Sequence, residues 1–133
     1  MQFGNLHPLI LHLPIGILAL AFLMELFYRK KPAPKDNGAI LFALGISVVS
    51  SIFAAVSGWL LSENGGYEEE LLSKHKWIAI AFTLGTILLF FLKKSTKKWA
   101  VKGYSPSFIL VLLLLTLTGH YGGSLTHGED FLF

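Results

Sequence analysis

The chain has 133 residues, of which 53% are hydrophobic and 14% are charged, and its mean hydropathy is +0.62. This length allows one domain, and the composition is too apolar for an ordinary soluble protein, so we predict a single membrane domain over residues 1–133. The chain has no cysteine, which excludes disulfides, thiolate metal sites and covalent c-type haem attachment within it. The net charge of +3 has its origin in loops beside apolar segments, and we expect no nucleic-acid partner.

Four apolar segments are long enough, or nearly so, to cross a hydrocarbon core of ~30 Å. We therefore predict an all-α membrane protein, a four-transmembrane-helix antiparallel bundle with helices at about residues 8–28, 39–62, 67–93 and 105–121. Acidic residues after the Asn64-Gly65-Gly66 break suit the first turn of the third helix. Gly122 and Gly123 are expected to end the fourth helix.

The basic residues predict how the chain is oriented in the membrane. Nine of the eleven lie in two stretches, "RKKPAPKD" and "KKSTKKWAVKG", which the positive-inside rule places in the cytoplasm. Both termini are then expected in the periplasm. We expect a multi-pass protein of a bacterial inner membrane, in contact with membrane lipid. Glu25 is the only acid of the first segment and lies near its cytoplasmic end, where it can snorkel or pair with Arg29.

All five histidines fall at or near the predicted outer ends of the helices, which favours one shared outer site: His7, His12, His75, His120 and His127. The alternative is that they are separate imidazoles at the membrane interface. Because His7 precedes Pro8, we expect it to cap the first helix, with His12 one turn inside. His7 and His12 differ by about 140° around a helix and do not share a face.

The other helices supply further candidate ligands. His75 recurs with Leu71 and Ala79 at helical spacing, which predicts that it faces inward where the third helix enters the bilayer. Thr116 and His120 are taken to mark the inward face of the fourth helix, and His127 is expected to fold back over the site from the tail.

Histidine-only ligation suits haem iron, zinc, copper and non-haem iron alike. A histidine pair from separate helices of a four-helix bundle suits haem b best, since Gly16, one turn beyond His12, leaves room for a planar macrocycle. We therefore predict a membrane-anchored electron carrier with haem ligands among His12, His75 and His120. A zinc, copper or iron ion held by His7, His12, His75, His120 and His127 is the alternative, and Glu129 and Asp130 keep an iron site open.

A third interpretation is a structural or assembly subunit of a larger membrane respiratory complex. In that case the histidines bond only backbone carbonyls and lipid headgroups. Nucleotide, phosphate and nucleophile motifs are absent from the sequence. A redox carrier or a complex subunit is therefore expected rather than a stand-alone enzyme.

The stretches "HPLILHLPIGI", "SKHKW" and "GHYGGSLTHGEDFL" together resemble the membrane domain-of-unknown-function 2231 family, in particular its branch associated with periplasmic c-type cytochrome domains. Members of the family occur fused to c-type cytochrome or Rieske iron–sulfur domains, so the resemblance implies electron-transfer partners. For the electron carrier predicted above, we expect a periplasmic c-type cytochrome or another redox protein as a partner, with a quinone as a further partner. The resemblance also implies that His7, His12, His75 and His127 are recurrent histidines and that His120 is typical of the branch.

Overall fold

The computed structural model describes residues 3–29 and 38–128. Every secondary-structure element there is a helix, which confirms the predicted fold class. In chain order, the elements are the 3-10 helix η1 (Phe3–Leu6) and the α-helices α1 (His7–Ile10), α2 (His12–Arg29), α3 (Gly38–Ser62), α4 (Glu69–Lys94) and α5 (Lys98–His127). Four spans in this part of the chain are long and apolar enough to cross a membrane: Phe3–Tyr28, Gly38–Ser62, Glu69–Lys94 and Lys98–His127.

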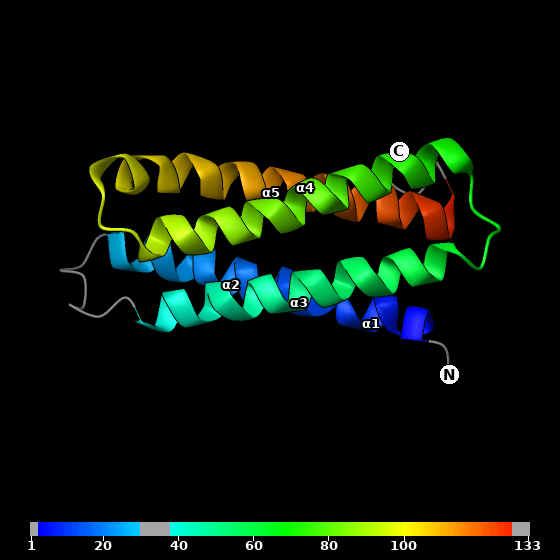
Figure 1. Ribbon diagram of the computed structural model, residues 1–133, viewed down its shortest axis with the longest axis horizontal. Helices are drawn as coiled ribbons and strands as arrows, with labels where there is room; N and C mark the ends of the chain where they lie inside the picture. The colour runs from blue at the N-terminus through cyan, green and yellow to red at the C-terminus, as the bar shows by residue number, and fades with distance from the viewer. Residues whose placement is uncertain (1–2, 30–37, 129–133) are drawn as a thin grey trace.

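The long helices run antiparallel along the chain, each packed against the next (Figure 1). The bundle has two ends. We call one the terminal end: η1 and α4 begin there, and α3 and α5 end there. We call the other the lysine end: α4 ends there with Lys93 and Lys94, and α5 begins there at Lys98. The other basic stretch, "RKKPAPKD", lies outside the described residues, except for the backbone of Arg29.

The first span is broken near its start, where a single helix over residues 8–28 is predicted. Leu11 separates α1 from α2, and Pro14 has no N–H for the carbonyl of Ile10. The preceding turn lies tightly against α3, since a Cβ on Gly4 would come within 2.7 Å of the Leu61 backbone nitrogen. The 3-10 helix η1 therefore packs against α3.

The buried apolar core fills the middle of the bundle and its lysine half. Leu18, Leu44 and Leu89 are fully buried there. Phe108 packs edge-on against Phe22, with ring centroids 5.5 Å apart. Because the large side chains are concentrated in this half, the terminal half is left less completely filled.

The fourth long helix extends beyond its predicted bounds of 105–121 at both ends, so those bounds were wrong. It begins at Lys98 because Ala100 and Tyr104 are buried against the core and stabilise extra turns. Pro106 lies inside it. The expected end at Gly122–Gly123 was also wrong, because both glycines stay helical and α5 ends only at His127.

Glu25 is tied to two other helices near the lysine end. Its Oε1 accepts hydrogen bonds from Lys93 Nζ on α4 and, at 2.7 Å, from Tyr104 OH on α5. The side chain of Arg29, with which pairing was expected, lies outside the described part of the chain. Three of the four spans thus meet at one partly buried carboxylate.

Candidate functional site: a cavity between histidines

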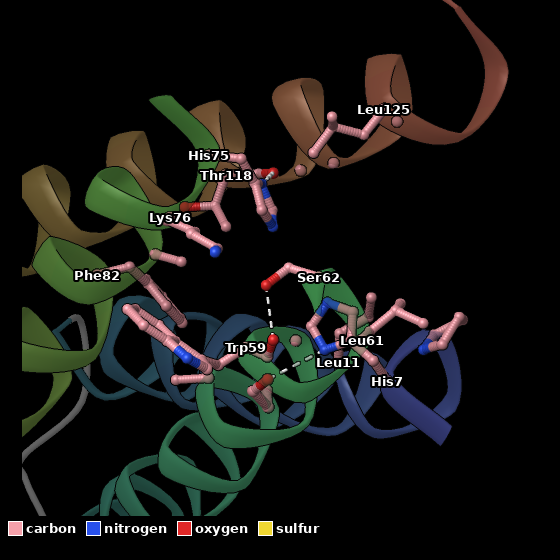
Figure 2. Close-up of a pocket in the computed structure, with 18 of the residues that line it drawn as sticks. His7, Leu11, Trp59, Leu61, Ser62, His75, Lys76, Phe82, Thr118 and Leu125 are labelled. Atoms are coloured by element: carbon pink, nitrogen blue, oxygen red, sulfur yellow. Dashed lines mark hydrogen bonds between the residues drawn. The ribbon is translucent and has the colours of Figure 1, made fainter. Parts of the chain in front are cut away.

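A cavity of about 490 Å³ occupies the terminal half of the bundle (Figure 2). All four long helices and α1 line it, and its walls are largely apolar, with Leu72, Ile80, Phe82 and Leu115 among them. This volume falls within the ~300–1,000 Å³ typical of cofactor and ligand sites.

His7 enters the cavity from α1. Its Nδ1 lies 3.0 Å from the carbonyl oxygen of Ala54 and 3.1 Å from Ser57 Oγ, both on α3. A carbonyl cannot donate, so Nδ1 carries the proton that it donates to Ala54, and in the neutral ring Nε2 is left as an unprotonated acceptor. The ring rests on Gly58, where a Cβ would come within 2.8 Å of His7 Cε1.

His75 enters the cavity from α4 in the same way. Its Nδ1 lies 3.1 Å from the carbonyl oxygen of Thr118 on α5, so Nδ1 donates and Nε2 is again the acceptor. A Cβ on Gly122 would come within 3.1 Å of His75 Cε1, so the glycine allows the ring to lie against α5. The prediction that His75 faces inward is confirmed.

The His7 and His75 rings lie on opposite sides of the cavity, which both residues line from separate helices (Figure 2). In metal and haem sites, a ligand histidine almost always donates its second ring N–H to a carbonyl, carboxylate or water, which fixes the tautomer and the ring orientation. Both histidines have such a partner. Their Nε2 atoms can therefore bind an iron atom, a metal ion or a hydrogen-bond donor.

The other three histidines are placed differently. His12 lines the cavity but is exposed, and its Nδ1 bonds the carbonyl of Pro8 on α1, one turn earlier in the same span. His127 also lines it, from the last turn of α5 and not from a folded-back tail, with Nδ1 2.7 Å from Thr126 Oγ1. His120 does not line the cavity, and its ring lies beside that of Tyr121 with centroids 5.5 Å apart.

Two further predictions about helix geometry were wrong. The N-cap of α1 is Leu6, and the His7 side chain bonds α3 instead of capping its own helix. Thr116 does not mark an inward face: it is exposed, and its hydroxyl bonds the Leu112 carbonyl at 3.0 Å within the helix. The cavity-lining face of α5 carries a different set of residues, namely Leu115, Thr118, Gly119, Gly122, Gly123, Leu125, Thr126 and His127.

Gly16 is exposed and is not among the lining residues, although its neighbour Ile15 is. A Cβ at Gly16 would meet nothing within 4 Å. The glycines that make room for imidazoles are Gly58 and Gly122, which the sequence reasoning did not single out for this role. The sequence does indicate that both glycines lie near the outer ends of their helices, at the level of the histidines. It does not indicate that Gly58 on α3 faces His7 or that Gly122 on α5 faces His75.

The charges of the lining also bear on its chemistry. Among the described residues, the lining includes no aspartate or glutamate, and Lys76 is its one side chain with a fixed charge. No group of three histidine, aspartate or glutamate side chains in this part of the chain is placed to hold a metal ion. Glu129 and Asp130 lie outside the described residues.

These features define a four-helix membrane protein with an apolar, imidazole-bearing cavity at one end of the bundle. A family model described as "Predicted membrane protein (DUF2231)" matches residues 4–129, so the chain belongs to that family. Neither the curated proteins nor the solved structures gave a match.

Proposed function

We propose that the protein is a membrane-anchored electron-transfer protein that binds haem b in this cavity, where His7 and His75 would hold the iron. One observation carries the proposal. Two imidazoles from separate helices face each other across an apolar cavity, and each is fixed by an Nδ1 hydrogen bond that leaves its Nε2 as an acceptor. Histidines that bind haem iron or metal ions characteristically have such a partner for the second ring nitrogen, and this supports the proposal.

The number of ligands favours haem over a bare metal ion. The porphyrin occupies four positions on iron, so the protein need supply only two axial ligands. Zinc takes three or four protein ligands, and hard cations need carboxylate or carbonyl oxygens. The described lining provides one opposed pair of imidazoles and no acidic side chain.

The axial pair differs from the set expected from the sequence. His75 belongs to both sets. His7 replaces His12 and His120, because His12 is exposed and bonded to the neighbouring turn of its own span, whereas His120 does not line the cavity. His12 and His127 then lie at the rim, where they border the ligand without binding its iron.

Haem bound here would supply one-electron chemistry, and the chain's own residues would set its conditions. Apolar walls exclude water and so tune the potential, and two axial histidines leave no position open for substrate. We therefore infer a carrier and not an enzyme, with a c-type cytochrome or another redox protein and a quinone as its partners. We place it in a bacterial inner membrane with the terminal end periplasmic, in accordance with the lysines at the other end.

The test is purification in detergent after expression with ample haem, followed by a pyridine haemochrome assay, elemental analysis and an absorption spectrum. We expect about one haem b per chain and a low-spin spectrum. His7→Ala and His75→Ala should each abolish the low-spin form, whereas His120→Ala should preserve it. Haem-free protein containing a stoichiometric zinc or copper ion would overturn the proposal, as would equal losses in all three variants.

A further inference from the structure

Lys76 follows His75 on α4 and lines the cavity. Its Nζ lies 4.5 Å from the centroid of the Trp59 ring on α3. In Figure 2 the side chain points toward the cavity, beside His75 and above Trp59. Because adjacent helical residues differ by about 100° around the axis, the ammonium group flanks the imidazole and does not occupy the same position.

The charge of Lys76 is not balanced by a carboxylate within the described part of the chain. Two ion pairs are found there, Lys74–Glu70 and Lys93–Glu25, and Lys76 takes part in neither. The cavity lining described above also contains no acid. The face of an aromatic ring stabilises a cation only partly, so an anion in the cavity would complement this site.

We infer that Lys76 is the anion-binding residue of this cavity. Its ligand is accordingly an apolar molecule that carries a carboxylate, oriented with the acid group toward Lys76. The inference rests on the proposed function, because haem b is flat, apolar and bears two propionates along one edge. His7 and His75 would hold the iron, and Lys76 on α4 would bind a propionate.

The test compares the affinities of haem b and of haem b dimethyl ester, which lacks the acid groups, for the full chain in detergent. A hydrogen bond to a charged group contributes about 1.5–3 kcal/mol, so we expect wild type to prefer the acid by about tenfold or more. Lys76→Met should remove this preference, and Lys76→Arg should retain it. Lys74→Met is the matched control, since Lys74 is 52% exposed, is paired with Glu70 and lies outside the cavity lining.

The outcomes separate this inference from the proposed function. If wild type binds neither compound, both are overturned. If wild type binds haem through His7 and His75 but does not distinguish the acid from the ester, only the role of Lys76 is overturned. The same follows if Lys76→Met keeps the preference, or if Lys74→Met loses it equally, because the effect would then come from general surface charge.

Discussion

At the scale of single residues, the cavity depends on two glycines that make room for two imidazoles. The His7 ring contacts Gly58, and the His75 ring contacts Gly122. In each case the ring also donates to a helical carbonyl, so its position is fixed from two sides. A methyl group at either glycine would therefore change the orientation of the ring more than it would change the fold.

Gly58→Ala tests this directly. The new Cβ would lie 2.8 Å from His7 Cε1, so the ring must turn away and lose its bond to Ala54. Alanine is favoured over glycine inside a helix by roughly 0.5–1 kcal/mol, which offsets part of that loss. We expect a melting temperature in detergent within a few degrees of wild type, roughly 1 kcal/mol of difference at most, together with at least tenfold weaker haem binding.

Gly16→Ala is the matched control for Gly58→Ala. Gly16 is exposed, does not line the cavity, and a Cβ there meets nothing within 4 Å, so both stability and haem affinity should stay at or slightly above the wild-type values. Equal haem affinity in the two variants would show that the orientation of the His7 ring does not matter for binding.

The sequence could indicate that histidines gather at one end of the bundle, but not which of them face the cavity. The inward position of His75 follows from helical spacing and is confirmed. His7 was placed at a cap because its bond to α3 depends on a long-range contact, the tight approach of Gly4 to Leu61, which has no local signal. The prediction that Thr116 marks the inward face of α5 was wrong because a threonine hydroxyl can bond a carbonyl of its own helix and remain exposed, as Thr116 does.

At the scale of helices, the lysine end is joined through Glu25. The Glu25 and Lys93 side chains are only 23% and 12% exposed, and Tyr104 donates to the same carboxylate oxygen. Removing one member of such a pair leaves a poorly solvated charge. The network therefore fixes how α2 lies against α4 and α5.

We predict that Lys93→Met lowers the free energy of unfolding in detergent by about 1–3 kcal/mol, because Tyr104 is then the one partner that the Glu25 carboxylate keeps among the described side chains. Combining it with Glu25→Gln should restore part of that loss, since the unpaired charge is then absent. Lys94→Met removes an exposed neighbouring charge and should have little effect. If the Lys93 and Lys94 variants unfold alike, the ion pair does not stabilise the bundle.

Helix bounds were predictable where local chemistry sets them. α4 begins at Glu69, within two residues of the expected start. The Glu68 carboxylate caps it by accepting hydrogen bonds from the backbone N–H groups of Glu70 and Leu71. The bounds of α5 were not, because burial of Ala100 and Tyr104 lengthens it at one end. At the other end, Gly122 serves ring packing and does not terminate the helix.

At the scale of the whole molecule, four spans place the terminal end and the lysine end on opposite sides of a membrane. The lysines predict that their end is cytoplasmic. Because the chain has no cysteine, a single thiol introduced at either end reports its side without further changes. Asn64, between α3 and α4, and Thr96, between α4 and α5, are exposed positions for this purpose.

We expect Asn64→Cys to react with a membrane-impermeant maleimide in intact cells. Thr96→Cys should react only after the membrane is permeabilised. The reverse pattern would invert the orientation and place the cavity on the cytoplasmic side. Labelling of both thiols in intact cells would contradict a fixed orientation.

The off-centre position of the cavity has an energetic consequence for the proposed electron transfer. His75 lies six residues from the start of α4, or about 9 Å along the helix, so the ligand would sit shallowly on the terminal side. Moving one charge through the full transmembrane voltage changes its energy by about 2.3 kcal/mol per 100 mV. An electron exchanged with a soluble carrier on that side would cross only a small part of this drop, so its transfer would be nearly independent of the membrane potential.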